Sequence, residues 1–333
     1  MILHLSPTLS DEQVADLARQ AEALWFREQG QPVLVNSAKQ TDVPPGLHAH
    51  VREVFRLSSD IQLASRQYRA ATREVPLAEG LTIGGETGHT LMIAGPCSVE
   101  SAAQIEQCAA FVKGLGVKVL RGGCYKPRTS PYSFQGLGLE GLQLLAQMRA
   151  RHGLPVITEV RDATQVADVI AHTDIIQIGA KAMYDHGILR ASGRAGKPVL
   201  LKRGFGTTLQ EFVQAAEFIL CEGNPHVILC ERGIRTFETK TRFTLDLCGV
   251  AWLKAHTNLP IVLDPSHAMG YRYGVPDLTR ACVAMGVDGL IIEVHPTPEQ
   301  ALSDASQQLN FSEFEALYHS LAPVAAAVGR KLV

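Results

Sequence analysis

Six lysine and arginine side chains stand where short apolar segments of the sequence end, in a chain whose formal net charge is −2. Buried cations of one sign repel each other, so a group of them requires anionic partners. Phosphate is the natural partner, because arginine grips it with a planar fork and lysine attracts it as a point charge. We therefore expect a site for more than one phosphate or carboxylate. Its predicted cations are Arg121, Lys126, Arg128, Lys181, Lys202 and Arg232.

A second group of residues joins a thiol, an imidazole and two carboxylates. A single cysteine or histidine most often belongs to a core, but His267 follows Asp264-Pro265-Ser266 and Glu293 ends an apolar run. Sulfur, nitrogen and oxygen donors together suit Mn²⁺, Fe²⁺, Co²⁺ or Zn²⁺ better than Mg²⁺. The sequence therefore predicts a divalent-metal site made of Cys97, His267, Glu293 and Asp304.

Both groups depend on eight short apolar segments that alternate with stretches of helical pattern. Continuous apolar strands separated by helices are typical of a parallel sheet buried on both faces. Eight such units fit a closed (β/α)₈ barrel, or TIM barrel, of roughly 250 residues. An open doubly wound α/β sheet is the alternative, but no GxGxxG turn follows the first strand. The predicted strands are 91–94, 117–120, 155–158, 175–178, 199–202, 227–230, 261–263 and 289–293.

The ends of these strands carry the polar residues of both groups. The first strand is followed by Cys97 and Ser98, the third by Glu159, and the seventh by Asp264. In a (β/α)₈ barrel, the catalytic groups come from the C-terminal ends of the strands. One charged strand end is usually a solvated loop, whereas eight polar strand ends together indicate a functional site.

Residues 1–75 differ in texture and predict a small α+β domain ahead of a barrel domain, 76–333. The expected strands of this small domain are 2–5, 32–35 and 61–65, and its expected helices lie near 11–26 and 47–55. The breaker-rich loop 39–46 occupies the place of one more expected strand. A short hairpin is predicted near 84–88, where glycines cluster.

The composition excludes several classes of protein. With 46% hydrophobic and 19% charged residues, the chain can bury a large core, and its net charge of −2 provides no field that would attract nucleic acid or a membrane. No segment reaches the roughly 18 apolar residues of a membrane span, and the N-terminal sequence lacks the features of a signal peptide. Seven cysteines without zinc-finger spacing favour a cytoplasmic protein with reduced thiols.

Seven segments of the barrel region resemble one known family. They are IAGPCSVE (93–100), VLRGGCYKPRTSPYSFQGLG (119–138), DIIQIGA (174–180), KPVLLKRGF (197–205), ILCERGIRTFE (228–238), DPSHAMG (264–270) and EVHPTPEQALSD (293–304). Together they resemble the type I-beta group of 3-deoxy-D-arabino-heptulosonate 7-phosphate (DAHP) synthases, the first enzymes of the shikimate pathway. The resemblance covers roughly residues 80–333. It implies a barrel, a ferredoxin-like N-terminal domain and a homotetramer.

The resemblance implies a role for most of the predicted site residues. The four predicted metal ligands match the divalent-metal ligands of the family. Lys202 and Arg232 match ligands of phosphoenolpyruvate, and Arg121 and Lys126 lie near its carboxylate and reacting carbons. The remaining implied substrate-binding residues are Arg128, Thr129, Glu159, Ala180, Lys181 and Asp264. The implied catalytic residues are Lys126, Cys97 and His267.

The implied reaction joins phosphoenolpyruvate, erythrose 4-phosphate and water to give DAHP and phosphate. The C3 carbon of phosphoenolpyruvate attacks the aldehyde, water adds at C2, and C–O cleavage releases phosphate. A metal ion acting as a Lewis acid can polarise the aldehyde oxygen or activate a water. The cations hold two charged substrates together, with Arg128 and Thr129 at the aldose-phosphate end.

Two features depart from the family pattern. The family usually has Gly-Ala-Arg-Asn after the fourth strand, where this chain has Gly179-Ala180-Lys181-Ala182. Lys181 keeps the charge but loses the planar fork, so we expect weaker phosphoenolpyruvate binding or an altered substrate preference. Because the N-terminal domain lacks an expected strand, we also expect weak or absent inhibition by aromatic amino acids. That domain would then serve assembly or cover the mouth of the barrel.

Two other functions fit parts of the pattern. The 3-deoxy-D-manno-octulosonate 8-phosphate synthases share the barrel and the phosphoenolpyruvate chemistry, but they carry Lys-Ala-Asn-Arg where this chain has Lys126-Pro127-Arg128. The Pro-Arg pair favours the four-carbon aldose phosphate. A barrel that only binds phosphoenolpyruvate is suggested by Lys181, but the presence of all four predicted metal ligands argues against it.

Overall fold

The computed structural model describes residues 1–126 and 130–333. In these parts of the chain, eight parallel strands close into a barrel, because each pairs with the next and the last pairs with the first. They are β7 (His89–Gly95), β8 (Val119–Arg121), β9 (Val156–Val160), β10 (Ile175–Ile178), β11 (Val199–Lys202), β12 (Val227–Glu231), β13 (Ile261–Leu263) and β14 (Gly289–Glu293). The predicted barrel is confirmed, and every predicted strand boundary lies within two residues of the observed one.

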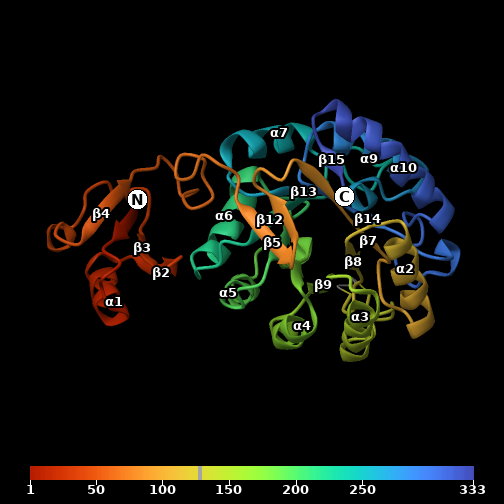
Figure 1. Cartoon of the computed structure of the whole chain (residues 1–333), viewed down its shortest axis with the longest axis horizontal. Coiled ribbons are helices and arrows are strands. Elements are labelled where there is room, and N and C mark those ends of the chain that lie inside the picture. Colours follow the sequence, from red (N-terminus) through yellow and green to blue (C-terminus); the bar gives the residue numbers. More distant parts are fainter. Residues whose placement is uncertain (127–129) are drawn as a thin grey trace.

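Helices surround the barrel on its outer side (Figure 1). They are α2 (Ala102–Gly114), α3 (Leu139–His152), α4 (Val166–His172), α5 (His186–Arg194), α6 (Leu209–Leu220), α7 (Leu247–His256), α9 (Val275–Ala284) and α10 (Phe311–Ala327). The short helix α8 (Pro265–Met269) instead follows directly on the C-terminal end of β13. Single 3₁₀ turns are η2 (Ala163–Gln165), η3 (Ala180–Ala182), η4 (Arg272–Gly274) and η5 (Pro298–Gln300). Reciprocal side-chain caps, Thr208 with Glu211 and Asn310 with Glu313, fix where α6 and α10 begin.

The apolar core of the barrel has two layers. Side chains that point inward fill the interior, and those that point outward pack against the helices. The hairpin of β5 (Glu74–Ala78) and β6 (Leu81–Gly84) closes one end, because Val75, Leu77 and Ile83 pack against the interior layer. A hairpin is therefore present, but it turns at residues 79–80, ahead of the predicted position. At the C-terminus, β15 (Lys331–Leu332) pairs with the start of β7.

The first 55 residues, all of them described, form a four-stranded antiparallel sheet in the order β2-β3-β1-β4. Its elements are β1 (Ile2–Leu5), α1 (Asp11–Gln20), β2 (Leu24–Glu28), β3 (Gln31–Val35), η1 (Pro45–Leu47) and β4 (Val51–Phe55). Helix α1 covers one face through Val14, Leu17 and Ala18. The chain order is that of a ferredoxin-like β-α-β-β-α-β unit whose second helix is reduced to the turn η1.

Three expectations for this small domain are wrong. No strand is missing from the sheet, because residues 24–28, of which 24–26 were expected in the first helix, form β2. The second expected helix, 47–55, is instead the turn η1 followed by β4, which pairs with β1. Residues 61–65 form no strand, and only Ser65 makes an isolated bridge, to Thr257. Strand pairing decides the conformation of 24–28 and 51–55, and that pairing is not visible in local sequence.

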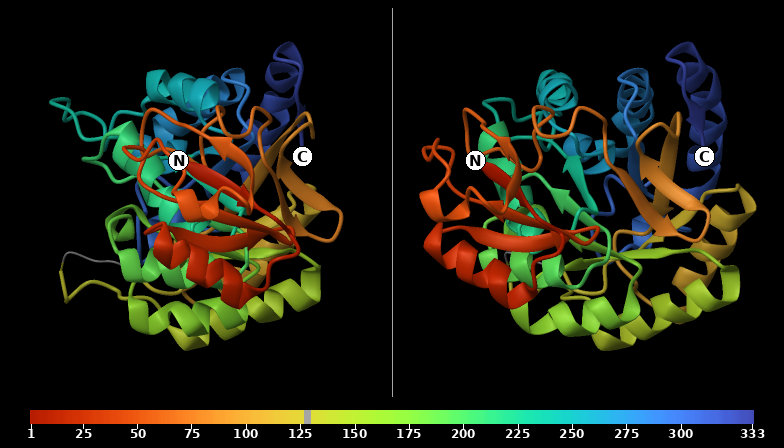
Figure 2. Two further views of the ribbon diagram at one scale, coloured as in Figure 1. Left: turned by 90° about the vertical axis from the view of Figure 1, so that its left-hand side faces the viewer. Right: turned by 60° about the vertical axis from the view of Figure 1, so that its left-hand side comes forward.

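The N-terminal domain lies beside the barrel (Figures 1 and 2). Phe26 lies against Gly223, and Arg73, in the segment that joins the domain to the barrel, donates a hydrogen bond to Asn258. Gly223 and Asn258 precede β12 and β13, so these contacts are at the N-terminal ends of the strands. The cavity described below is at the opposite ends. Within one chain, these contacts place the domain away from the mouth of the barrel.

A buried carboxylate fastens the linker between the two domains to α6. Glu217 of α6 accepts hydrogen bonds from the backbone N–H groups of Gln62, Leu63 and Ala64, at 2.7, 3.1 and 2.9 Å. The Gln62 side chain in turn accepts a 2.6 Å bond from the N-terminal amino group of Met1. Burial raises the pKa of Glu217 to about 7, although the three N–H donors act to lower it.

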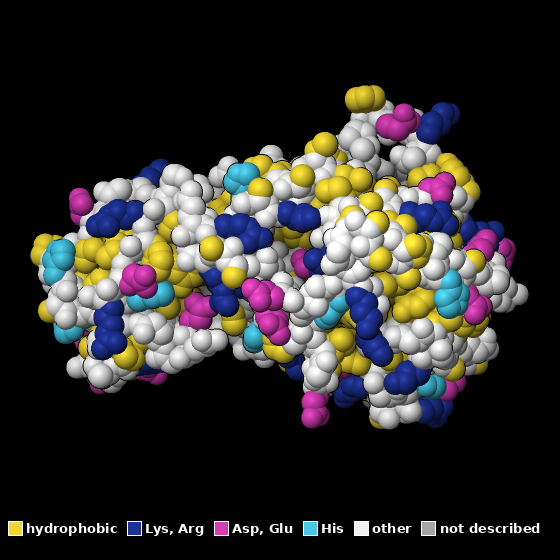
Figure 3. Space-filling model, turned by 45° about the horizontal axis from the view of Figure 1, so that its top comes forward, with side chains coloured by type: hydrophobic (Ala, Val, Ile, Leu, Met, Phe, Trp, Pro, Cys, Tyr) yellow, Lys and Arg dark blue, Asp and Glu magenta, His cyan; other side chains and the backbone are white. Residues whose placement is uncertain are grey.

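The charges on the surface and the length of the helices bear on two kinds of partner considered above, nucleic acid and membrane. On the face seen in Figure 3, Lys and Arg side chains are interspersed with Asp and Glu. No helix in the described part of the chain is long and apolar enough to cross a membrane. All seven cysteines are free thiols.

Candidate active site and metal centre

A cavity of about 320 Å³ opens at the C-terminal ends of the barrel strands. Its walls come from the C-terminal ends of seven strands and the loops that follow them, where the (β/α)₈ architecture places active sites. The lining residues are Lys126, Glu159, Ala180, Lys181, Lys202, Phe205, Arg232, Arg235, Arg242, Phe243, His267 and Asp304. Cations outnumber carboxylates, so the cavity is suited to anionic ligands.

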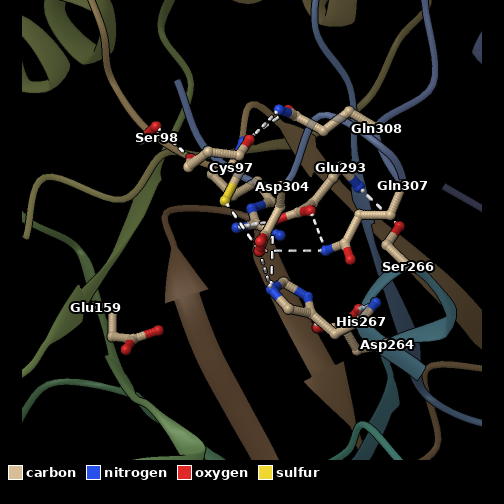
Figure 4. Close-up of polar contacts among 12 residues, drawn as sticks. Cys97, Ser98, Glu159, Asp264, Ser266, His267, Glu293, Asp304, Gln307 and Gln308 are labelled. Carbon is tan, nitrogen blue, oxygen red and sulfur yellow. Dashed lines mark hydrogen bonds and ion pairs between the residues drawn. The ribbon is translucent and has the colours of Figure 1, made fainter. Parts of the chain in front are cut away.

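Three of the four predicted metal ligands lie together, and one of them, Asp304, lines this cavity. The candidate donor atoms of Cys97, Glu293 and Asp304 all lie within 4.8 Å of one another. The Cys97 thiol is 3.5 Å from Asp304, and the close-up in Figure 4 shows both side chains pointing to the same space. Asp304 has φ +50°, a left-handed conformation that aspartate adopts more readily than most residues.

The fourth predicted ligand, His267, completes the group from α8. Its Nε2 atom is 3.4 Å from Glu293 and 3.7 Å from Asp304. Its Nδ1 atom is 2.8 Å from Asp264, whose carboxylate also caps α8 through the His267 N–H. Burial lowers the pKa of His267, which favours the neutral imidazole that binds metals.

The four side chains fit a divalent cation. Glu293 Oε1 is buried and accepts no well-aligned hydrogen bond from the described residues, although Arg121 lies 3.0 Å away. The carboxylates of Glu293 and Asp304, whose donor oxygens lie within 4.8 Å of each other, repel each other unless a cation lies nearby. One thiol, one imidazole and two carboxylates suit Mn²⁺, Fe²⁺, Co²⁺ or Zn²⁺. The donor set therefore agrees with the predicted metal site. His267 lies near two of the other three donors, Glu293 and Asp304.

Lys126 links the metal donors to the cavity. Its Nζ atom is 3.0 Å from Cys97 Sγ and 3.1 Å from the Cys97 carbonyl oxygen. Burial and the nearby Glu293 raise the pKa of Cys97 to about 12, so the thiol keeps its proton until a cation displaces it. Burial opposes the charge of Lys126, but Cys97 and Glu293 raise its pKa above the ordinary value.

Two glutamines behind the metal donors hold them in place. Gln307 donates a 2.6 Å hydrogen bond to Glu293 Oε2 and accepts a 2.7 Å bond from Arg242. Gln308 accepts a 2.9 Å bond from the backbone N–H of Cys97. Such partners orient metal ligands and are often as necessary as the ligands themselves.

The predicted cations fall into two classes in the structure. Lys202 is 2.6 Å from Asp264, and Arg121 is 3.0 Å from Glu293, so both are neutralised by buried carboxylates. Burial acts to raise the pKa of Asp264, but His267 and Lys202 hold it well below its ordinary value. Arg232 differs, because it is buried, faces the cavity, and its Nη1 atom has no hydrogen-bond partner in the described chain. A buried guanidinium in this state indicates an anion site.

The geometry is matched by a family comparison. A profile described as the DAHP synthetase I family matches residues 68–328. A protein of Thermotoga maritima, named phospho-2-dehydro-3-deoxyheptonate aldolase, is 46% identical over 282 residues, which are 85% of this chain and 82% of that protein. The chain belongs to the DAHP synthetase I family.

Solved structures agree with this membership over the whole chain. A crystal structure of the Thermotoga maritima DAHP synthase covers 100% of this chain and 99% of its own, with 40% identity and a TM-score of 0.80. A truncated form of that enzyme covers 81% of this chain, with 43% identity and a TM-score of 0.76. The full-length relative therefore shares both the barrel and the N-terminal domain.

The rival family is also represented among the relatives. A protein of Bradyrhizobium named 2-dehydro-3-deoxyphosphooctonate aldolase is 33% identical over 270 residues, covering 76% of this chain and 94% of that protein. Both groups share the barrel region, and the higher identity lies with the heptonate enzyme. The DAHP synthetase I assignment therefore agrees with the sequence prediction.

Three of the remaining predicted site residues lie on the cavity wall. Glu159, Ala180 and Lys181 line it, and the Glu159 carboxylate accepts a 2.7 Å bond from Gln177. Asp264 does not line the cavity and instead contacts Lys202 and His267. Arg128 and Thr129 lie outside the described residues.

Sequence reasoning missed several residues of this family member's cavity. Phe205, Arg235, Arg242 and Phe243 line its rim, and Gln307 lies behind it. These residues stand in long loops, several positions beyond the ends of β11, β12 and β14. Arg235 belongs to the segment 228–238 that resembles the family, and that motif was the available signal.

Proposed function

We propose that this protein condenses phosphoenolpyruvate with erythrose 4-phosphate and water to give DAHP and phosphate. The observation that carries this proposal is one cavity lined by six lysine and arginine side chains, with a cluster of possible metal donors that includes Asp304 of its lining. Two phosphorylated substrates require the cations, and the aldehyde that must be activated requires the metal donors. Family membership and the likeness to the heptonate aldolase support the same reaction.

The cations position the substrates. We assign Arg232, Lys181 and the paired Lys202 to the phosphate of phosphoenolpyruvate, since all three line the cavity. Arg121 and Lys126 are assigned to its carboxylate and reacting carbons, and both line, with Glu159, a smaller pocket beside the cavity. Arg128 and Thr129 are assigned to the aldose phosphate on the family motif alone. Holding two anions in contact against their repulsion is a large part of the catalytic task.

Cys97, His267, Glu293 and Asp304 would hold a divalent metal, with Mn²⁺, Fe²⁺, Co²⁺ and Zn²⁺ as the candidates. When bound, such an ion supplies Lewis acidity at the aldehyde end of the cavity. Asp264 keeps His267 oriented through its Nδ1 atom, and Gln307 leaves Glu293 Oε1 directed to the shared space.

Lys126 is the residue best placed to act on the reacting atoms. Its ammonium lies at the cavity wall beside Cys97, where the aldehyde oxygen gains negative charge as the new C–C bond forms. We assign it to stabilise that oxygen by a hydrogen bond or proton from Nζ. Water then adds at C2 of the former phosphoenolpyruvate, and cleavage of the C2–O bond releases phosphate.

The decisive experiment compares two aldoses. Phosphoenolpyruvate consumption and phosphate release are measured with erythrose 4-phosphate and with arabinose 5-phosphate, before and after prolonged chelation by EDTA. We expect turnover with the four-carbon aldose, loss after chelation and recovery with Mn²⁺ or a similar ion. Preference for arabinose 5-phosphate would instead assign the octulosonate reaction. Full activity in a preparation shown by elemental analysis to be metal-free would refute the metal requirement.

Two further assignments accompany the reaction. We propose a homotetramer, on the family resemblance, and a cytoplasmic location, which the free thiols support. Light scattering of the purified protein measures the first, and fractionation of cells measures the second.

A further inference from the structure

Two phenylalanine rings that line the cavity lie against arginine side chains. Phe205 and Phe243 are stacked with their centroids 5.4 Å apart. The Arg232 guanidinium lies 4.4 Å from the Phe243 centroid, and the Arg235 guanidinium lies 4.8 Å from the Phe205 centroid. Both arginines and both rings line the cavity. The aromatic pair therefore holds two planar cations at the cavity.

The backbone fixes the place of Arg235. Its N–H donates a 2.6 Å hydrogen bond to the Phe205 carbonyl oxygen, which ties the loop after β12 to the loop after β11. Next to it, Ile234 and Thr244 exchange two backbone hydrogen bonds of 2.9 Å, which closes the base of the loop between β12 and α7. Figure 2 shows this loop, in teal, projecting from the body of the barrel. Arg235 thus starts from a fixed base although its side chain is exposed.

The charges on this wall are not balanced by the protein. The Arg235 guanidinium forms no ion pair with any described carboxylate, and Arg232 Nη1 has no hydrogen-bond partner among the described residues. Lys202, which lines the same cavity, is already neutralised by Asp264. Two guanidinium groups that line one cavity favour an anion bound there. Each presents a fork of N–H donors that matches phosphate.

We propose that Arg235 binds the phosphoryl group of phosphoenolpyruvate together with Arg232, and that it supplies the planar fork absent at Lys181. This inference rests on the proposed function and adds one substrate-binding residue to it. Lys181 lines the same cavity but offers its charge from a single atom, without the two-point grip of a guanidinium. Phe205 acts as a positioning residue, because its ring and its carbonyl oxygen both hold Arg235.

The neighbours of Arg235 favour a role in binding phosphoenolpyruvate over a role in binding the aldose phosphate. Arg235 shares its aromatic pair with Arg232, and Lys181 and Lys202 line the same cavity. The aldose phosphate is assigned to the loop after β8, which follows a different strand. A change at Arg235 should therefore act on one substrate and leave the other almost unaffected.

The first test is Arg235→Gln, which removes the charge and the fork. We expect the KM for phosphoenolpyruvate to rise roughly ten- to a hundredfold, the loss of one charge-assisted hydrogen bond, with the KM for erythrose 4-phosphate unchanged. Thermal stabilisation of the protein by phosphoenolpyruvate alone should fall in parallel. Arg235→Lys should recover only part of the loss. Lys240→Gln, on the same loop but outside the cavity, is the matched control and should behave as the wild type.

The second test combines substitutions at Arg235 and Lys181. Lys181→Arg should restore much of the phosphoenolpyruvate affinity in the Arg235→Gln background and add little to the wild-type chain. Phe205→Leu should raise the same KM, and it should have no further effect once Arg235 is replaced. That non-additivity distinguishes a positioning role from a general loss of packing.

Several results would overturn the inference. Unchanged phosphoenolpyruvate binding by Arg235→Gln and Arg235→Lys, both folded by circular dichroism, would remove Arg235 from the site. A rise confined to the KM for erythrose 4-phosphate would place it at the other phosphate. Binding of phosphoenolpyruvate alone is read without turnover, so a wild-type chain inactive with both aldoses would reject the proposed function and still leave this assignment testable.

Discussion

The two oxygens of Glu293 have separate tasks. Oε2 accepts the 2.6 Å hydrogen bond from Gln307, whereas Oε1 faces Arg121 and His267. Gln307 is itself held by Arg242 from the rim of the cavity. A carboxylate fixed by one oxygen presents the other in a single direction, which is what a metal ligand requires.

Replacing Gln307 by leucine should weaken metal binding without unfolding the barrel. The variant keeps the volume but leaves Glu293 Oε2 unpaired and free to rotate, so we expect about a 10- to 100-fold loss of metal affinity. The measurement is a Co²⁺ titration followed by the thiolate–cobalt absorption, which reads the metal site directly. Gln300→Leu, an exposed glutamine of the same loop region, is the control. Equal Co²⁺ affinity in both variants would contradict the role of Gln307.

Residues at strand ends were the ones that the sequence could identify. Cys97, His267 and Glu293 stand at or just after apolar runs, where the barrel architecture places functional groups. Arg235 and Gln307 stand inside loops whose path depends on aromatic and amide contacts made after folding. Single-residue patterns carry no trace of those contacts, so only the family motif pointed to one of them.

At the scale of elements, prediction succeeded where burial alone decides the structure. The eight barrel strands are buried on both faces, so they appear as continuous apolar runs. The N-terminal sheet has one face under α1 and is only partly covered on the other, and its strands β2 and β4 carry charged residues. The segment 51–55 satisfies helical and extended periodicities equally well, and its pairing with β1 decides between them.

The hairpin β5–β6 closes the end of the barrel opposite the cavity, and this role predicts an effect on stability. Ile83 is fully buried against the interior layer, so Ile83→Ala should lower the free energy of unfolding by about 2–5 kcal/mol. Glu79→Ala, at the exposed turn of the same hairpin, should have almost no effect. Urea denaturation of both variants is the measurement. A similar loss in both would show that the turn, and not the apolar contact, holds the hairpin.

At the scale of the whole molecule, Glu217 joins the N-terminal domain to the barrel in a pH-dependent way. Burial raises its pKa from 4.5 to about 7, so between these values the folded chain binds more protons than the unfolded chain. Stability contributed by this group is therefore complete below about pH 4.5 and is lost as the pH rises through 7, at up to about 1.4 kcal/mol per pH unit.

The Glu217→Gln variant isolates this contribution. The difference in unfolding free energy between the wild type and the variant should shrink from pH 5 to pH 8, measured by urea denaturation at each pH. The opposite trend is also informative. If the advantage of the wild type grows with pH, the three N–H donors outweigh burial, and the ionised carboxylate is the form that fastens the linker.

The N-terminal domain also bears on regulation. The sequence prediction about inhibition rested on a missing strand, and that reason is wrong. Weak or absent inhibition by aromatic amino acids was expected because a strand was missing, but the sheet is complete. That expectation therefore loses its structural reason. The domain also contacts the barrel at the strand ends away from the cavity, so any influence on catalysis within one chain must pass through the barrel or through another subunit.

Removing the N-terminal domain separates these possibilities, and it also tests the predicted boundary near residue 75. We would begin the shortened chain at Ser59, because Gln62 and the residues that follow it remain bound to Glu217 and Asn258. No residue of 1–58 lines the cavity, so the shortened chain should keep the KM for both substrates. Light scattering and the response to phenylalanine and tyrosine are measured on both chains. Loss of activity in a folded, smaller assembly would show that the domain serves the active site of a neighbouring subunit, and inhibition of the full chain that disappears on truncation would restore a regulatory role for the sheet.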